Sequence, residues 1–430
     1  MQVVIVGNGV TGVTAAITIR KLNPVALITL ISSESTHFFS RTALMYLYMG
    51  HMQYRHIKPY EDWFWTEHKL NLMQASVASV DFSAKEVVLS SQVRVPYDKL
   101  LLATGSIPRA LEIPGENLAG VQGFYSLPDL ENLEKYSQQI KRAVIVGGGL
   151  IGIELAEMFY TRCIPVTFLV RENYYWGNVL PPEEGNLIQE HIREHGVDLR
   201  LNTTLQEIKG DSDGKVKAIV TGQGEEIPTD LVGVAVGVRP NVSFLKGSPL
   251  KLNRGILVNP YLETNLPDVY AAGDCAEIVP DKDKNTYIEQ LWYTGRMQGE
   301  TVAHSICNRR TAYSRGIWFN SAKFFDIEYQ TYGKVPVKPD SETQTLVWQH
   351  PKRKKLLRIN YHQPTGKVLG FNLLGIRYRH EVCENWIREE KPISYVLKHL
   401  REANFDPEFY RRYEKEIIQA FSRQLSAVIP

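Results

Sequence analysis

Two segments of the chain share one pattern of apolar and polar positions. Each has a short β-branched run, a glycine-rich turn and apolar residues at helical spacing, as in VVIVGNGVTGVTAAITI (3–19) and AVIVGGGLIGIELAEMF (143–159). A further apolar run follows each segment, ALITLI at 26–31 and PVTFLV at 165–170. Strand, crossover helix and strand together form a βαβ unit. The pattern therefore predicts two doubly wound nucleotide-binding domains.

Between and after these units, further strands end at glycine. The stretch KLLLATGSIPRALEIPG (99–115) reads as a strand that ends in Thr-Gly, and IPTDLVGVAVGVRPN (227–241) is similar. A strand at 269–272 ends at Gly273 and Asp274, and LWYTGRMQGETVAHSI (291–306) has the composition of a helix. Ligands of doubly wound sheets bind beyond such carboxyl ends, so these turns are candidate binding positions.

The pattern changes near residue 313. Alternating apolar runs follow, namely KFFDIEYQTYG, TLVWQH, KLLRINYH and KVLGFNLLG, and they predict an antiparallel sheet. Residues after 378 are rich in Glu, Arg, Lys and Leu and are typical of helices. The expected fold is α/β, with two Rossmann-like doubly wound nucleotide-binding domains and a C-terminal α+β domain.

Composition narrows the class of protein. The chain has 430 residues, which is long enough for two or three domains. Its net charge of +2 gives no basic field for nucleic acid or a membrane surface, and no apolar run is long enough to span a membrane. The start of the sequence has no basic segment followed by a long apolar one, so we expect no signal peptide.

Cysteine usage points to a reducing compartment. The four cysteines lie far apart and form no CxxC pair: Cys163, Cys275, Cys307 and Cys383. This spacing argues against a zinc site and against a disulfide framework, and it fits a cytoplasmic protein. We expect no metal centre, and we expect Cys275 to pack as a small buried residue.

The two glycine turns predict two dinucleotide sites. Their glycines are Gly7, Gly9 and Gly12 in the first turn and Gly147, Gly149 and Gly152 in the second. In such a turn the first glycine permits the bend, the second lets a pyrophosphate approach, and the third lets the helix pack closely. The helix N-terminus adds N–H groups for the phosphates. Glu34, after the second strand, is placed to bind a ribose hydroxyl.

Five stretches together resemble the FAD-dependent pyridine nucleotide-disulfide oxidoreductase superfamily. In chain order they are VVIVGNGVTG, LLLATGSIPR, AVIVGGGLIGIELA, VAVGVRPN and VYAAGDCAE, and they span most of residues 1–300. The resemblance implies FAD in the first unit and NADH or NADPH in the second. It further implies an FAD domain at 1–115 and 243–312, an NAD(P)H domain at 116–242 and a C-terminal interface or dimerisation domain at 313–430.

The resemblance also assigns residues to FAD. Asp274 would accept a ribityl hydroxyl, and the helix from Trp292 would direct its positive end at the flavin. Trp292 has the alternative of simple core packing. The remaining positions are Val77 at the adenine, Thr104 and Gly105 along the FAD path where the chain crosses between domains, Gly273 beside Asp274, and Arg109 and Gly237 as further cofactor-binding residues.

The second unit carries the nicotinamide assignments. Glu154 lies two residues after Gly152, and by resemblance it orients the nicotinamide; a dipole-favoured acid in the first turns of a helix is the alternative. At the end of the second strand, Arg171 could bind the 2′-phosphate of NADPH and Glu172 the ribose diol of NADH. We expect no strong preference between the two.

The stretch HFFSRTALMYLYMG (37–50) contains no cysteine, although thiol-dependent members of the superfamily keep one or two at this place. Its Ser40-Arg41 pair and the apolar helix after it resemble the branch of NAD(P)H rubredoxin and ferredoxin reductases and the flavin part of NAD(P)H nitrite reductases. Arg41 would lie by the FAD pyrophosphate. Members of this branch often have a lysine where this chain has Tyr46.

The expected activity is electron transfer from NAD(P)H through FAD without a cysteine relay. A small redox carrier protein, such as rubredoxin, ferredoxin or an iron–sulfur partner, is the first candidate acceptor, and a small molecule is the second. The alternative is a slow flavoprotein that senses NAD(P)H, similar to apoptosis-inducing factor. A homodimer is compatible with both. His37, His51 and His56 are candidate proton donors, and HPKRKK (350–355) is either a solvated hairpin turn or an acidic-partner site.

Overall fold

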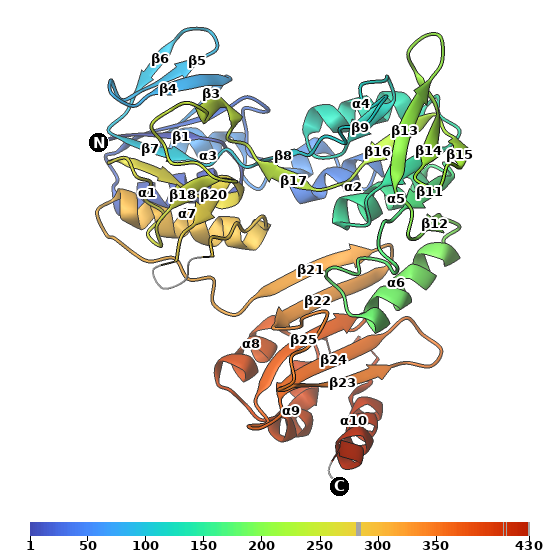
Figure 1. The fold of residues 1–430 in the computed structure, drawn as a ribbon. Coiled ribbons are helices and arrows are strands. Elements are labelled where there is room, and N and C mark those ends of the chain that lie inside the picture. The colour runs from blue at the N-terminus through green and yellow to red at the C-terminus, as the bar shows by residue number, and fades with distance from the viewer. Residues whose placement is uncertain (281–284, 407, 410, 429–430) are drawn as a thin grey trace. The chain divides into compact units, whose positions relative to one another are not determined.

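The computed structural model describes residues 1–280, 285–406, 408–409 and 411–428. These residues form two compact units (Figure 1). The first comprises residues 1–111, 123–139 and 236–315, and the second comprises residues 112–122, 140–235 and 316–430.

The first unit is built on a five-stranded parallel sheet in the order β19-β7-β1-β2-β3. Its strands are β19 (Val269–Ala271), β7 (Lys99–Leu102), β1 (Gln2–Val6), β2 (Leu27–Ser32) and β3 (Leu70–Gln74). The central strand β1 is almost entirely buried because both faces of the sheet are covered, which explains its continuous apolar sequence.

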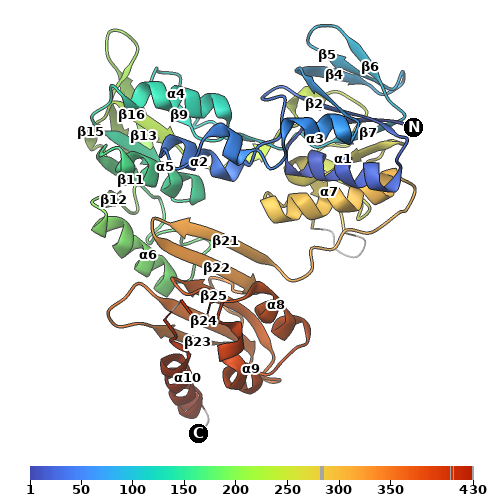
Figure 2. The ribbon, with the colours of Figure 1, turned by 180° about the vertical axis from the view of Figure 1, so that it is seen from behind.

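Helices α1 (Val10–Leu22) and α7 (Trp292–Ile306) pack side by side in this unit (Figure 2). Glycines allow the close contact: a Cβ atom on Gly299 would lie only 2.5 Å from the carbonyl oxygen of Thr11. The predicted helix at 291–306 is thereby confirmed. Helix α1 begins directly after β1 and its glycine turn, so the sheet fixes where its N-terminus lies, and α7 is then held by its packing against α1.

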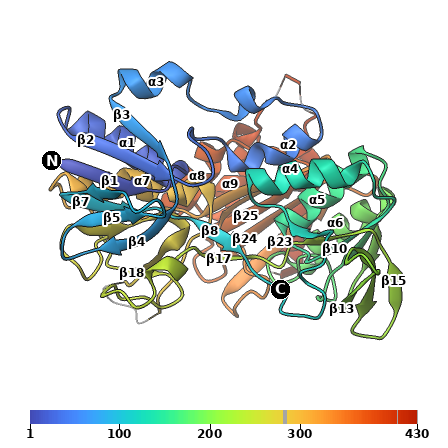
Figure 3. The same ribbon diagram turned by 90° about the horizontal axis from the view of Figure 1, so that it is seen from above.

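Smaller elements complete the first unit. Helix α3 (Asp62–Glu67) lies beside β3, and α2 (Leu44–Tyr48) lies beside α4 (Leu127–Ser137) (Figure 3). The remaining strands form a three-stranded antiparallel sheet of β4 (Val77–Asp81), β5 (Glu86–Leu89) and β6 (Arg94–Pro96), and the pairs β8 (Ser106–Pro108) with β17 (Val238–Pro240) and β18 (Ile256–Val258) with β20 (Ala276–Ile278).

The second unit contains the other glycine turn. Its first sheet has the order β12-β11-β10-β16-β9, from β12 (Asp198–Arg200), β11 (Val166–Leu169), β10 (Ala143–Val146), β16 (Leu231–Val234) and β9 (Val121–Gly123). Helix α5 (Leu150–Thr161) connects β10 to β11, and α6 (Pro182–Glu194) leads to β12. A small antiparallel sheet joins β13 (Leu205–Gly210), β14 (Val216–Thr221) and β15 (Glu226–Pro228).

The C-terminal part of this unit is a five-stranded antiparallel sheet with helices. Its order is β21-β22-β25-β24-β23, from β21 (Phe319–Phe324), β22 (Ile327–Gly333), β25 (Val368–Leu374), β24 (Leu356–His362) and β23 (Thr343–Gln349). The helices are α8 (His380–Arg388), α9 (Ile393–His399) and α10 (Glu414–Val428). Leu357 and Ile359 of β24 share a core with Trp386 and Phe421 from these helices.

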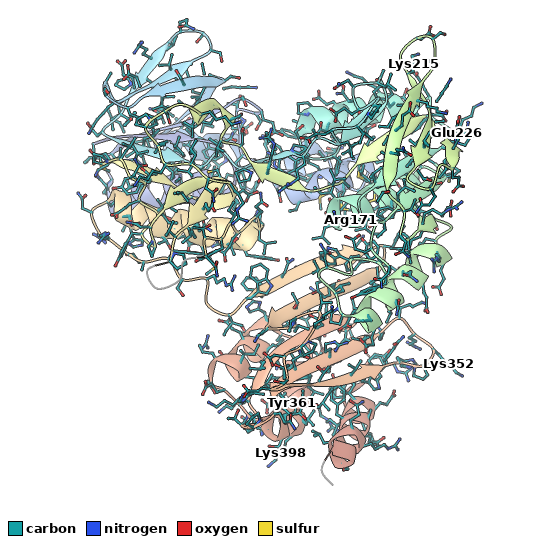
Figure 4. All side chains as sticks on the ribbon, viewed as in Figure 1. Arg171, Lys215, Glu226, Lys352, Tyr361 and Lys398 are labelled. Carbon is teal, nitrogen blue, oxygen red and sulfur yellow. The ribbon has the colours of Figure 1, made fainter. Side chains whose placement is uncertain are left out.

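These observations confirm the predicted fold class, including the antiparallel sheet and the C-terminal helices. The run at 350–355 is the turn between β23 and β24, and Lys352 extends from its tip (Figure 4). The predicted three-domain boundaries stay a prediction, since the two units group residues 123–139 with the first nucleotide-binding sheet and residues 316–430 with the second. No helix in the described part of the chain is long and apolar enough to cross a membrane.

A buried ion pair joins α6 to the C-terminal sheet. Arg358 of β24 alternates with Leu357 and Ile359, so its side chain points to the opposite face of the sheet. There it donates from Nε to Oε1 of Glu184 at 2.6 Å and from Nη2 to Oε2 at 2.9 Å, and both side chains are buried. Glu183 and Asn372 add hydrogen bonds to this pair. A bidentate pair of this kind fixes both distance and angle.

Replacing Arg358 with Met should therefore destabilise the protein, because buried Glu184 would lose the counter-charge and the two hydrogen bonds of Arg358. We expect a loss of about 3–5 kcal/mol, measured as an earlier transition in urea unfolding. Lys367→Met is the control, because Lys367 pairs with Glu390 at the surface and should contribute at most about 1 kcal/mol. Equal shifts for the two variants would contradict the assignment.

Candidate functional site

Both glycine turns place a helix N-terminus at the carboxyl end of a parallel strand. A Cβ atom on Gly12 would lie 2.0 Å from the carbonyl oxygen of Gly7, and one on Gly152 would lie 2.2 Å from that of Gly147. Only glycine permits these contacts, so each helix begins directly against its turn. Gly9 and Gly149, the N-caps of α1 and α5, have no atom within 4 Å of a Cβ position among the described residues.

The two helix starts can bind phosphate. Neither helix has a side-chain hydrogen bond at its N-cap in the described structure, so the first N–H groups of α1 and α5 remain available to an anion. The open position at the middle glycine gives a pyrophosphate room to approach the backbone. The geometry therefore fits the predicted dinucleotide at each turn.

Glu34 and Arg41 form a bidentate ion pair in the first unit. Nη2 and Nη1 of Arg41 donate to the two carboxylate oxygens of Glu34 at 2.5 and 3.1 Å, and Nη1 also donates to the carbonyl oxygen of Tyr125 at 2.6 Å. Burial opposes the charge on Arg41, but the hydrogen bond and charge of Glu34 outweigh it, so the pKa of Arg41 is raised. The sequence assigned both residues to FAD without predicting that they pair.

Asp274 ends a short hydrogen-bonded chain. Its Oδ2 accepts from Oγ of Ser106 at 2.8 Å, and that hydroxyl accepts from Nε2 of Gln290, also at 2.8 Å. Burial raises the pKa of Asp274, although Ser106 and Arg41 favour its ionised form. A carboxylate has four lone-pair directions, so Asp274 can still accept hydrogen bonds from ligand hydroxyls.

A second network fixes the backbone before Asp274. The N–H of Gly273 donates to Oε1 of Gln298 at 2.7 Å, and Nε2 of Gln298 lies 3.4 Å from Oε2 of buried Glu289. Glu289 also accepts from the hydroxyl of Tyr313 at 2.6 Å and from Arg315 at 3.1 Å. Helix α7 thus positions the Gly273 turn as well as presenting its own N-terminus.

Hydrogen bonds join two segments, residues 104–109 and 237–241, where the chain passes from one sheet to the other. The hydroxyl of Thr104 donates to the carbonyl oxygen of Asn241 at 2.8 Å, and the N–H of Asn241 donates to Gly105 at 3.0 Å. Beside them, Nε of Arg109 donates to the carbonyl oxygen of Val238, and its N–H donates to that of Gly237. Four predicted residues are therefore neighbours of this crossing: Thr104, Gly105, Arg109 and Gly237.

The remaining first-unit assignments occupy separate elements. Val77 begins β4, where it pairs with Leu89, and Trp292 is the first residue of α7 and is half-buried. Among the three histidines, His37 lies 3.7 Å from Asp62, His51 stacks with Tyr46, and His56 accepts from the N–H of Gln53. No observation tests whether these residues contact a cofactor or transfer a proton, so the assignments stay predictions.

Glu154 lies in the second unit on α5, five positions after its Gly149 N-cap. Its environment disfavours charge: burial, and then the neighbouring Glu157, raise the pKa of Glu154 to about 7. Glu157 is itself paired with Nζ of Lys323 at 2.7 Å. The carboxyl group of Glu154 is therefore poised to change its ionisation near neutral pH.

Arg171 and Glu172, the two candidates for recognising the ribose, contact each other. Nε of Arg171 donates to Oε1 of Glu172 at 3.0 Å. The side chain of Arg171 is 76% exposed and extends from the ribbon after β11 (Figure 4). A positive and a negative side chain are thus both present at the end of β11. The geometry is compatible with Arg171 binding the 2′-phosphate of NADPH and with Glu172 binding the ribose diol of NADH.

The stretch at 37–50 is ordered by packing. After a 3₁₀ turn at Arg41–Ala43, helix α2 buries Leu44, Met45 and Tyr48, and Tyr46 lies against His51 with 6.2 Å between ring centroids. The apolar helix predicted here is confirmed.

Sequence reasoning missed several groups that position the site. Tyr125, Glu289, Gln290 and Gln298 belong to none of the five motifs, and Ser106 lies within LLLATGSIPR without having been assigned a role. The partners of these residues lie 9 to 184 positions away. Tyr125 is an example of how burial acts here: burial, and then the charge of Asp274, raise its pKa to about 12. One signal was present in the 291–306 segment: on a helix, Gln298 falls on the same face as Gly295, Gly299 and Val302, and that face is buried.

Comparison with known proteins identifies the family. The family model described as pyridine nucleotide-disulphide oxidoreductase matches residues 1–299. The chain therefore belongs to this family, and it is an FAD-dependent NAD(P)H oxidoreductase by class. FAD and NADH or NADPH are its cofactors, as the resemblance implied.

Two relatives place the chain in the predicted branch. It is 34% identical over 282 residues to nitrite reductase [NAD(P)H] of Bacillus subtilis, a match that covers 64% of this chain and 34% of that protein. It is 33% identical over 286 residues to rubredoxin-NAD(+) reductase of Acinetobacter baylyi, covering 64% of this chain and 72% of that one. The chain thus spans about a third of the nitrite reductase.

A solved structure shows the same fold. The putidaredoxin reductase in a covalent complex with putidaredoxin has a TM-score of 0.81 and 22% identity to this chain. The match covers 98% of this chain and 99% of that one, so it includes the C-terminal sheet and helices as well as both glycine turns.

Matched alanine substitutions should separate the two glycine turns. Gly12→Ala forces a Cβ onto the carbonyl of Gly7, so we expect FAD binding at least about tenfold weaker, measured as flavin content and by FAD titration. Gly152→Ala should leave flavin content unchanged and raise KM for the nicotinamide cofactor at least about tenfold. If Gly152→Ala lost flavin and Gly12→Ala did not, FAD would belong to the second glycine turn and the nicotinamide cofactor to the first.

Proposed function

We propose that this protein takes hydride from NADH or NADPH onto FAD and passes electrons, without a cysteine relay, to a small redox carrier protein. The observation that carries the proposal is the thiol-free segment at 37–50. A serine or threonine hydroxyl cannot replace a thiolate, because its pKa lies far above that of cysteine. An acceptor must therefore approach the flavin itself.

The two cysteines of the first unit, Cys275 and Cys307, do not supply a relay. Cys275, next to Asp274, is buried, its thiol donates to the carbonyl oxygens of Leu102 and Ala272, and burial raises its pKa. Cys307 follows the last residue of α7, about 22 Å along the helix axis from its N-terminus. A relay needs an accessible, easily ionised thiol beside the flavin, and neither residue fits this description.

When bound, FAD supplies the change from two-electron to one-electron chemistry. In our proposal the residues of the first unit bind and orient it. The N-terminus of α1 and Arg41 neutralise the pyrophosphate, Glu34 binds the adenosine ribose and Asp274 accepts a ribityl hydroxyl. The N-terminus of α7 would stabilise negative charge at the flavin ring. The pairing of Glu34 with Arg41 holds both groups in place before the ligand arrives.

Glu154 would act on the nicotinamide. As hydride leaves, the nicotinamide ring becomes positively charged, and an ionised carboxylate beside it stabilises that charge. We propose further that either nicotinamide cofactor is accepted, because Arg171 and Glu172 offer a group for each ribose form. Comparison of kcat/KM for NADH and NADPH measures this directly.

The relatives support a protein acceptor. One is named for rubredoxin, and a solved neighbour is a complex with putidaredoxin. We propose the same class of partner here, a small redox carrier, with a small-molecule acceptor as the second candidate. A cytoplasmic location fits the four free cysteines. The C-terminal part is proposed to form a homodimer interface.

Acceptor specificity tests the proposal. Anaerobic steady-state assays with NADH or NADPH should compare rubredoxin, a [2Fe–2S] ferredoxin, a quinone, oxygen and ferricyanide. We expect at least one carrier protein to exceed quinone and oxygen at least about tenfold in kcat/KM. Cys275→Ala should retain this activity. Slow turnover with every acceptor, ferricyanide included, would favour a sensor, and inactivity of Cys275→Ala would overturn the thiol-free route.

The ionisation of Glu154 should appear in the pH profile. The carboxyl group is neutral below its pKa of about 7 and ionised above it, and the ionised form stabilises the forming cation. The rate of flavin reduction, measured by stopped flow, should therefore rise as pH increases through about 7.

Two variants of the same helix serve as controls for this profile. Glu154→Gln should remove the inflection. Glu157→Gln should keep it but move it to lower pH, because the charge of Glu157 raises the pKa of Glu154. An unchanged inflection in Glu154→Gln would assign it to another group.

A further inference from the structure

Three potential metal ligands meet in the second unit, apart from the predicted cofactor residues. His191 and His195 lie one turn apart at the end of α6, and Asp326 lies between β21 and β22. Their ligand atoms lie within 4.8 Å of one another. Oδ1 of Asp326 is 2.5 Å from Nε2 of His191 and 3.8 Å from Nε2 of His195.

The proton positions on the two imidazoles favour coordination. Nδ1 of His195 lies 2.9 Å from the carbonyl oxygen of His191. A carbonyl oxygen only accepts hydrogen bonds, so Nδ1 carries a proton. Nε2 of His195, 3.8 Å from Oδ1 of Asp326, is then the nitrogen that can bind a metal. Metal-bound histidines commonly have this arrangement, with the second nitrogen bonded to a carbonyl or carboxylate.

His191 supplies an independent observation. Its side chain is only 8% exposed, and its Nδ1 has no hydrogen-bond partner in the described structure. Oε2 of Glu194 lies 3.7 Å from this nitrogen, too far for a hydrogen bond but close enough to accept one after a small shift. Binding of a metal at Nε2 would place the proton on Nδ1 and give it this carboxylate as its partner.

Four basic residues lie near the cluster, and carboxylates offset the charge of two of them, Lys354 and Arg377. His191 and Asp326 line a cavity of about 520 Å³ together with these basic residues. Most of them have partners: Lys354 pairs with Glu190 and Glu194, and Arg377 pairs with Glu328. Arg353 donates to the hydroxyl of Tyr413, and Lys355 donates to the carbonyl oxygen of Gly375. The cavity also gives an ion a path from solvent.

We propose that His191, His195 and Asp326 bind a divalent transition-metal ion, with zinc as the best match. Two imidazoles and one carboxylate form a donor set suited to zinc, and three protein ligands leave a fourth position for water. Two ligand atoms of tetrahedral zinc lie about 3.3 Å apart. The pair of Asp326 and His191, now at 2.5 Å, must therefore open by about 1 Å, and the pair of Asp326 and His195, now at 3.8 Å, must close by about half an ångström. The exposed position of Asp326 in a turn permits that movement.

The site would join two elements that are distant in sequence. Helix α6 belongs to the parallel-sheet part of the unit, and Asp326 belongs to the C-terminal antiparallel sheet. The buried Arg358–Glu184 pair already connects the first turn of α6 to that sheet. A metal at the last turn would fix the other end of the helix, so binding should raise the thermal stability of this unit.

The test uses the flavin-loaded protein with Cys163→Ser as background, since Cys163 is the exposed cysteine. After chelator treatment and its removal, Zn²⁺ is titrated by calorimetry, and the unfolding temperature is measured with and without Zn²⁺. We expect one ion per chain, a dissociation constant of about 1 µM or lower and a higher unfolding temperature. Millimolar Mg²⁺, which prefers oxygen ligands, should give neither effect.

Matched variants keep the proposal falsifiable. Asp326→Asn retains the shape and a hydrogen bond to His191, and His195→Asn leaves buried His191 in place; each should weaken Zn²⁺ binding at least about tenfold. His362→Asn, which removes a surface histidine paired with Glu342, should not. Zn²⁺ binding that is absent, or equally tight in Asp326→Asn and His362→Asn, would overturn the site and leave the cluster a hydrogen-bonded histidine–aspartate pair.

Discussion

The close approach of a helix to its own glycine turn is the constraint on which both nucleotide-binding sheets depend. At Gly12 and Gly152 the space of a single Cβ atom is occupied by a carbonyl oxygen. The helix therefore starts where the strand ends, and its free N–H groups face the edge of the sheet at which ligands bind. Helix α7 adds to this arrangement because its glycines let it lie directly on α1, with Trp292 at its own N-terminus.

The two units differ in how the charged groups of their predicted sites are compensated. In the first, the charged groups are paired before any ligand is present, as Arg41 with Glu34 and Asp274 with Ser106. In the second, Glu154 has no such counter-charge in its immediate helix, and Glu157 adds repulsion. The paired arrangement agrees with the FAD site proposed for the first unit, and a carboxyl group with a pKa near neutrality agrees with the nicotinamide site proposed for the second.

The sequence predicted the parts of this structure that depend on local pattern. The glycine spacing, the apolar strands and the alternating C-terminal runs each require only neighbouring residues, and the structure confirms the elements they predicted. The motif order also led to the correct family. Pairings across long sequence separations were out of reach: Ser106 meets Asp274 across 168 residues, and Arg358 meets Glu184 across 174. Which residues meet in this way depends on how the strands pair in the folded protein, and a single sequence does not reveal that pairing.

The Arg358–Glu184 pair has a consequence for how this architecture can be recombined. A buried bidentate pair tolerates neither a missing partner nor a changed angle. Consider a chimaera in which the C-terminal sheet, from about residue 316 onward, comes from a relative. Arg358 would then be separated from Glu184 of α6, its partner in this protein. The unit that can be inherited or transplanted intact is therefore α6 together with the C-terminal sheet, although 124 residues separate the end of the helix at Glu194 from the start of β21 at Phe319.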